Sequence, residues 1–401
     1  MDLVKPFINR ILYPAMEIKN GNRIRQNIGE LLDSQNYMPA EVRQLQERKL
    51  KLLLNECIRN VPAYRRFGDL KNEIDNNAFN ALLKFPVLSK AEFSKNPDVY
   101  INETVPASQL IPNRTGGSTA EPVKFYMDRH TVEYYEAARW RGLSWWGITP
   151  GSRSVMIWGS PLELNQAEQK KYRFKEKWLK NRIMIPAYAL KPERMRDYIH
   201  TIIDYRPEYL YGYSSALYAF SSHMLETDMK LPLKLKAVVS TSETLFDFQR
   251  QMIQKAFNCP VVNEYGARDG GILAMECPKG SMHISAENAI LEIVDPKTYE
   301  TLPYGQSGVL LVTDLNNFSM PRLRYKLGDM AVLSGQPCAC GMGLPVLEKI
   351  DGRVDDMFIT MDGELVHGHA FNHIARSLSA IKKFQIIQHS PSYAVLSIIK
   401  N

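Results

Sequence analysis

A short loop rich in glycine and hydroxyl groups offers the first chemistry in this chain. The stretch RTGGSTAEPVKFY covers residues 114–126 and ends in an apolar, strand-like run. Two adjacent glycines let a backbone turn and expose successive N–H groups, and hydroxyl side chains add donors, so a phosphate could bind in the bend. The loop lacks the lysine of a Walker A motif. Taken alone, it is more typical of an ordinary hairpin turn. The candidate ligands are Thr115, Gly116, Gly117, Ser118 and Thr119.

Further polar residues follow two Val-Val pairs, in VVSTSETL and in VVNEYGARDGG. Open α/β sheets bind their ligands at the carboxyl ends of parallel strands, so residues in these positions are candidates for a binding site. Downstream, VTDLNNFSMPRLRYKLGDM ends at Asp329, and IDGRVDDMFITMDG follows it. Each of these features alone has an ordinary structural explanation, because an aspartate after glycine is usually a turn residue and a tyrosine is often part of the core.

The elements that would position these residues alternate between strands and helices. Residues 1–110 are predicted to be mostly helical, and HTVEYYEAARWRGLSWWG predicts an aromatic-rich helix that ends at Gly147 and Pro150. Short apolar runs then alternate with helical segments up to residue 266, which is typical of a parallel sheet with helical crossovers. From residue 282 onward, closely spaced strands with turn signals predict an antiparallel β-subdomain. The fold class is therefore α/β.

Four metal-ligating side chains lie in two groups, Cys277 with His283, and Cys338 with Cys340 in PCACG. Three thiolates and one imidazole make a closed tetrahedral set suited to structural Zn²⁺. The alternative is that each cysteine is a small core residue, but that reading does not explain the grouping. Cys57 and Cys259 have no such partners and are expected to be core thiols.

The bulk properties describe an ordinary globular protein. The 401 residues suggest two or three domains, with 45% hydrophobic and 23% charged residues. The net charge of +7 lacks the basic, aromatic-rich stripe of a nucleic-acid binder. Without a signal peptide or a long apolar run, the protein is expected in the cytoplasm. The basic N-terminal 30 residues could contact a membrane surface, although packing on the protein's own core is the more ordinary outcome. The sequence is compatible with a homodimer.

In their order along the chain, the hydroxyl-glycine loop, the Tyr-Gly motif, R-Y-x-x-G-D and G-R-x-D-D resemble the adenylate-forming superfamily. Within it, they resemble the branch of phenylacetate–CoA ligase and CapK-like proteins, over residues 80–375. The spacing of the cysteines and histidine is similar to that of metal-bearing members of this branch. The resemblance implies a large adenylation domain over 1–352, with the β-subdomain and its metal site at 282–350. A small α+β lid domain would follow at 353–401, incomplete because the usual catalytic lysine loop is missing; Lys400 matches no such loop.

The resemblance also implies a role for each matched residue. The loop at 115–119 would wrap the phosphates of ATP, Tyr265 and Gly266 would place adenine, and Asp329 would accept hydrogen bonds from the ribose. Arg353 would contact the ribose or the α-phosphate, and Asp355 would be the hinge of the lid. The nucleotide pocket would further be lined by Ser242, Glu243 and Glu264.

Two positions depart from the family pattern of Tyr-Gly-x-Ser/Thr-Glu. Asp269 would keep a carboxylate for Mg²⁺, one methylene shorter than the usual glutamate. Arg268 replaces a hydroxyl, so it would either neutralise charge on the phosphate or signal altered chemistry.

The expected activity is attack of a carboxylate on ATP, followed by acyl transfer to CoA or to an amine, with capsular or exopolysaccharide synthesis as one setting. Aromatic residues at 134–146, 209–217 and Trp158 would line the acyl pocket. A nucleotide-binding protein without turnover is the alternative.

Overall fold

The computed structural model describes residues 4–115, 123–159, 174–187, 190–353, 357–359, 361–362, 365–367 and 380–400. Its N-terminal part is helical, as expected. These elements are α1 (Val4–Phe7), η1 (Ile8–Leu12), α2 (Tyr13–Asn20), α3 (Ile24–Ser34), α4 (Pro39–Asn60), η2 (Pro62–Leu70), α5 (Lys71–Asn76), α6 (Ala78–Leu82), α7 (Lys90–Lys95), η3 (Pro97–Tyr100) and η4 (Ala107–Gln109).

The long helix α4 shows why this part of the chain is helical. Pro39 opens it at the first helical position, and the Glu41 carboxylate accepts the Met38 backbone N–H at 2.7 Å. Leu50, Leu54 and Cys57 recur at helical spacing and are fully buried. Cys57 is therefore a core thiol, as expected.

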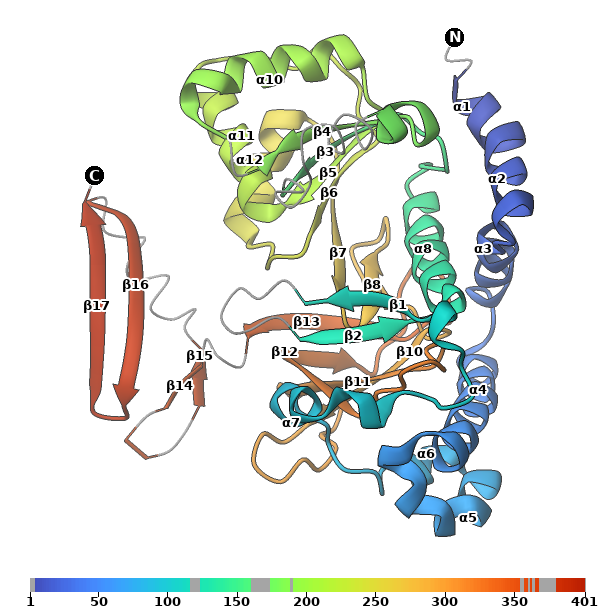
Figure 1. Ribbon diagram of the computed structural model, residues 1–401. Coiled ribbons are helices and arrows are strands. Elements are labelled where there is room, and N and C mark those ends of the chain that lie inside the picture. Colours follow the sequence, from blue (N-terminus) through green and yellow to red (C-terminus); the bar gives the residue numbers. More distant parts are fainter. Residues whose placement is uncertain are drawn as a thin grey trace.

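An eleven-stranded mixed sheet organises the rest of the chain, in the order β10-β11-β12-β13-β9-β8-β7-β6-β5-β3-β4. Its parallel half contains β3 (Ser154–Trp158), β4 (Arg182–Pro186), β5 (Tyr209–Tyr213), β6 (Ala237–Thr241) and β7 (Val261–Ala267). The crossover helices are α10 (Pro192–Tyr205), α11 (Ser214–Glu226) and α12 (Asp247–Phe257), which gather around these strands in Figure 1. The prediction of an α/β fold with helical crossovers is confirmed.

The antiparallel half continues the same sheet. It contains β8 (Gly271–Glu276), β9 (Met282–Ile284), β10 (Ala289–Val294), β11 (Gly308–Asp314), β12 (Tyr325–Ser334) and β13 (Val346–Arg353). Antiparallel pairing already begins between β7 and β8, ahead of the expected start at residue 282. The reversal depends on a close approach, since a Cβ on Gly266 would lie 2.5 Å from the Gly271 carbonyl oxygen.

Smaller elements flank the sheet. The predicted aromatic helix is α8 (Arg129–Ser144), and it lies beside α3 in Figure 1. The hydroxyl-glycine loop joins β1 (Ile111–Arg114) to β2 (Lys124–Met127), which pair as an antiparallel hairpin. Near the C-terminus, β14 (Met357–Ile359) pairs with β15 (Leu365–His367), and β16 (Ile381–Ser390) pairs with β17 (Tyr393–Lys400). Among the described residues, no helix is both long and apolar enough to span a bilayer.

Candidate nucleotide site and metal centre

Three strands bring a tyrosine, an aspartate and an arginine together. The Tyr265 hydroxyl on β7 donates to Asp329 Oδ2 at 2.6 Å. Asp329 on β12 pairs in register with Arg353 on β13, and Arg353 Nε lies 3.5 Å from Asp329 Oδ1. The three residues are separated by up to 88 positions in the sequence, so only the sheet makes them neighbours. We call this set the Tyr-Asp-Arg cluster.

Burial dominates the electrostatics of this cluster. It raises the pKa of Asp329 above its ordinary value, although Tyr265, Arg353 and Lys90 each act to lower that pKa. Burial likewise raises the pKa of Tyr265 well above its ordinary value, and the neighbouring carboxylate adds to the shift. The tyrosine is therefore a hydrogen-bond donor at neutral pH, and the aspartate is its acceptor.

Gly328 allows this arrangement through its backbone. Its φ of +94° lies in the region that favours glycine. A Cβ on Gly328 would also lie 3.0 Å from Arg353 Nη2. The glycine of the R-Y-x-x-G-D motif thus gives the guanidinium the space to reach the aspartate.

Asp269 lies beside the cluster, on the turn between β7 and β8, and it is only 4% exposed. Tyr325 donates to its Oδ2 at 3.0 Å, and Lys90 Nζ lies 3.4 Å from the same oxygen. Lys90 was not singled out from the sequence, because a lone lysine after a serine N-cap belongs to no motif. It is positioned by Leu88, which bonds to the backbone of β12 next to Tyr325.

The candidate phosphate loop begins close to this turn. Arg268 is exposed, and its Nη1 lies 3.5 Å from the Arg114 carbonyl oxygen at the end of β1. Thr115 closes the base of the hairpin, because its hydroxyl accepts the Val123 backbone N–H at 2.9 Å. Gly116, Gly117, Ser118 and Thr119 lie outside the described residues, as does Asp355.

Two of the other expected nucleotide ligands, Glu243 and Glu264, have side-chain contacts within the fold. The Glu243 carboxylate accepts the Ser215 backbone N–H at 2.7 Å and the Ser215 hydroxyl at 3.0 Å. It therefore supports the N-terminal end of α11, where the helix dipole favours an anion. Ser242, just before it, has a φ of +66°.

Glu264 precedes Tyr265 on β7 and lies in a buried polar group with α8 and β5. It accepts hydrogen bonds from Tyr211 and from Thr241, and Arg139 Nε lies 3.4 Å from its second oxygen. Trp158, expected to line an acyl pocket, stacks on Tyr213 at 4.3 Å between ring centroids. Arg139 is a second residue that the sequence analysis did not identify. The charged residues around it in the sequence are typical of the exposed face of a helix.

The four metal-ligating residues do converge. The ligand atoms of Cys277, His283, Cys338 and Cys340 all lie within 4.8 Å of one another. Two thiolates bound tetrahedrally to zinc at about 2.3 Å would be about 3.8 Å apart, and the sulfurs of Cys277 and Cys338 are 3.7 Å apart. His283 Nδ1 lies 3.2 Å from the Leu344 carbonyl oxygen, which requires a proton on Nδ1 and leaves Nε2 to bind a metal, 3.1 Å from Cys340 Sγ. The donor set fits a structural zinc ion.

Glycines shape both turns of this centre. Gly280 and Gly341 each have a φ of +84°, and they follow the Cys277 and Cys340 turns. Backbone N–H groups of Lys279 and Cys340 point at the Cys277 and Cys338 sulfurs, each at 3.4 Å. Together the ligands join strand β9 and the β8–β9 connection to the β12–β13 connection. Cys259 is buried apart from this centre, as expected.

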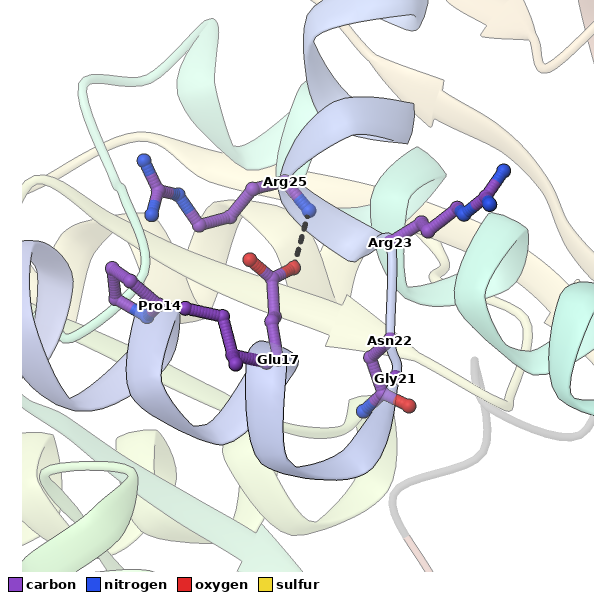
Figure 2. Close-up of a pocket in the computed structure, with 7 residues that line it drawn as sticks. Pro14, Glu17, Gly21, Asn22, Arg23 and Arg25 are labelled. Atoms are coloured by element: carbon purple, nitrogen blue, oxygen red, sulfur yellow. Dashed lines mark hydrogen bonds between the residues drawn. The ribbon is translucent and has the colours of Figure 1, made fainter.

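A hollow of about 440 Å³ lies well away from these residues, at the end of α2 (Figure 2). Its lining includes Glu17, Arg23 and Arg25. The Glu17 carboxylate occupies its centre and accepts the Arg25 backbone N–H at 2.7 Å.

Known proteins resemble this chain in sequence and in fold. Protein CapK of Staphylococcus aureus is 27% identical over 300 residues, which cover 71% of this chain and 61% of CapK. The phenylacetate–coenzyme A ligase of Thermus thermophilus is 26% identical over 343 residues, covering 80% of this chain and 73% of that protein. No protein-family model matches the chain.

A solved structure of 2-hydroxyisobutyryl-CoA ligase in the postadenylation state, in complex with 2-HIB-AMP, superimposes with a TM-score of 0.70. It is 19% identical, and the match covers 88% of this chain and 77% of the other. The likeness shows that this chain shares the α/β fold of that ligase over most of its length.

Proposed function

Because this chain belongs to the adenylate-forming superfamily, on its CapK and phenylacetate–CoA ligase branch, we propose that it activates a carboxylic acid with ATP. A carboxylate oxygen of the acid attacks the α-phosphorus, the bond to the bridging oxygen breaks, and pyrophosphate leaves. The product is an acyl-adenylate. The observation that carries the proposal is the Tyr-Asp-Arg cluster, assembled by three strands that are distant in sequence.

The cluster suits the nucleoside part of ATP. An ionised Asp329 can accept from the Tyr265 hydroxyl and still take the two hydroxyl donors of a ribose. The ring of Tyr265 provides a flat surface for adenine. Arg353 brings a permanent positive charge to the side from which the α-phosphate would approach.

The turn at Arg268 and Asp269 suits the phosphates. Arg268 reaches the start of the hydroxyl-glycine loop, so that Thr115–Thr119 and the guanidinium would meet the same phosphate chain. Both described contacts of the Asp269 side chain involve Oδ2, and Oδ1 would hold Mg²⁺. When bound, Mg²⁺ supplies charge neutralisation on the phosphate oxygens. Lys90 adds a second cation beside Asp269 and lowers the repulsion between that carboxylate and Asp329.

The second half-reaction would transfer the acyl group. The sulfur of CoA, or an amine, attacks the acyl carbon and AMP leaves. The similarity to phenylacetate–coenzyme A ligase supports CoA as the acyl acceptor. The similarity to CapK supports the alternative, an amine acceptor in polysaccharide synthesis. The aligned region spans 61% of the length of CapK, so any activity of the whole relative is part of this proposal only.

The acid would bind between α8 and β5, next to Trp158 and Tyr213. Aromatic side chains there favour an aryl or apolar acid. The buried ion pair of Arg139 Nε and Glu264 Oε2, 3.4 Å apart, would offer charged groups to an acid with an additional polar group.

The test is acid-dependent exchange of labelled pyrophosphate into ATP, with Mg²⁺ and a panel of aryl acids with and without amino or hydroxyl groups. We expect exchange for at least one acid and none without acid. The matched control is Glu103→Gln, which changes an exposed carboxylate paired with Arg65 and is expected to keep exchange. Tight ATP binding without exchange for any acid would favour a nucleotide-binding protein without turnover, an alternative that the arginine at position 268 supports.

A further inference from the structure

The N-terminal helical segment, residues 4–20, has a docked side and an open side. On the docked side, Ile8 is fully buried, and a Cβ on Gly151 would lie 3.1 Å from it. Lys5 pairs with Glu208 at 2.8 Å, and Arg129 donates to the Asn20 carbonyl oxygen. These contacts fix the segment on the body of the protein, as Figure 1 shows for α1 and α2 beside the main fold. Its open side is therefore a permanent part of the surface.

The open side carries large apolar side chains. Phe7 is 51% exposed, Ile11 is 58% exposed and Ile18 is 84% exposed. Helical spacing of four and seven residues keeps side chains on one side of a helix. Single exposed apolar residues are common on protein surfaces, but a row along one helix indicates a binding surface.

Cations surround this row. Arg10, Lys19, Arg23 and Arg25 are all exposed. Figure 2 shows Arg23 and Arg25 projecting on opposite sides of the hollow, while Glu17, the acid among residues 4–25, is held inside by the Arg25 backbone N–H. The open side therefore presents apolar groups within a positive border.

We propose that this open side, which we call the docking face (Phe7, Ile11 and Ile18 with Arg10, Lys19 and Arg25), rests on an anionic phospholipid bilayer. The apolar row enters the interface between head groups and acyl chains, and the cations meet lipid phosphates. A second copy of this chain is a poorer occupant, because two docking faces would place cations against cations. The proposal is independent of the catalytic function.

The test is sedimentation of the whole chain with vesicles of phosphatidylcholine alone and of phosphatidylcholine with phosphatidylglycerol. We expect binding to the anionic vesicles only, and we expect it to weaken as salt rises. The triple variant Phe7→Ser, Ile11→Ser and Ile18→Ser should lower the partition coefficient at least about tenfold, since the exposed apolar surface is lost. Removing charge with Arg10→Gln and Lys19→Gln should lower it roughly fivefold for each cation.

The matched control replaces equally exposed apolar residues elsewhere, Leu52→Ser and Tyr304→Ser, which are 65% and 70% exposed. This control should bind like the unchanged chain. Thermal unfolding checks that each variant is folded. If the triple apolar variant does not fold, the charge variant still tests the proposal. Three results would overturn the proposal: no binding to anionic vesicles, equal binding by the triple variant, or a dimer that the triple variant abolishes while no vesicle binding occurs.

Discussion

Replacing Asp329 by asparagine should separate nucleotide binding from folding. The carboxylate accepts a 2.6 Å bond from Tyr265 and lies 3.5 Å from Arg353 Nε. Hydrogen bonds to a charged group contribute about 1.5–3 kcal/mol, which corresponds to roughly 10- to 150-fold in affinity. If Asp329 holds the ribose, Asp329→Asn should raise the KM for ATP by about that factor in the pyrophosphate exchange assay.

The same substitution should not lower stability. Because burial raises the pKa of Asp329, the ionised form is disfavoured in the folded chain, and a neutral amide of the same size removes that cost. The denaturant midpoint should stay the same or rise. Acidification offers a second check: ATP affinity should begin to fall at a higher pH than for an exposed aspartate, and this pH dependence should vanish in the variant.

A double-mutant cycle with Tyr265→Phe completes the experiment. The phenylalanine keeps the ring and removes the hydroxyl, so its effect on the KM should be large in the unchanged chain and small in the Asp329→Asn background. An unchanged KM for ATP in Asp329→Asn, or a loss of affinity that only parallels a loss of stability, would refute the role of this cluster.

Three further predictions concern the rest of the molecule. Removal of metal by a chelator should lower the melting temperature of the unchanged chain by several degrees and leave that of Cys340→Ser unchanged. Elemental analysis should find one zinc per chain. An absence of zinc, or a chelator effect that persists in the variant, would contradict the site. Arg141 and Glu287 form a buried pair at 2.8 Å, so Arg141→Met should cost about 3–5 kcal/mol in denaturant unfolding, while adding Glu287→Leu should recover most of it; equal stabilities of the single and double variants would refute this. Burial lowers the pKa of Lys49 to about 8, below its unfolded value, so the unfolded chain binds more protons between the two pKa values and stability should rise with pH from about 8 to 10.5. Lys49→Met should flatten that rise, and a slope unchanged in the variant would exclude this origin.

Much of the fold could be predicted from local patterns. The alternation of apolar runs and helices indicated the parallel half of the sheet, and helix α8 was recognised from its aromatic residues and the glycine after it. The start of the antiparallel half was harder, because the reversal at β7–β8 depends on how closely Gly266 and Gly271 approach, and no periodicity records such a contact.

The site was predictable where short motifs carry it. The R-Y-x-x-G-D and Tyr-Gly motifs predicted Asp329 and Tyr265 as candidates, and the structure places them in contact. Cysteine spacing predicted the four candidate metal ligands, which lie together. Lys90 and Arg139 escaped because their positions follow from tertiary packing, through Leu88 on β12 and through α8 on the sheet. The Glu243 carboxylate bonds to Ser215 at the start of α11, a contact that the strand-end pattern does not predict.

Strand β13 connects the candidate metal centre to the Tyr-Asp-Arg cluster. It begins just after the loop that carries Cys338 and Cys340, and it ends at Arg353, roughly 23 Å away at the usual rise per residue. Two register shifts interrupt its pairing with β12, so the alignment of Arg353 with Asp329 depends on the register along the whole strand. A slip of one position would turn the terminal guanidinium to the opposite face of the sheet. The four candidate metal ligands lie at one end of β13 and Arg353 lies at the other. A change in the cysteine cluster that shifted this strand would therefore also move the guanidinium away from Asp329.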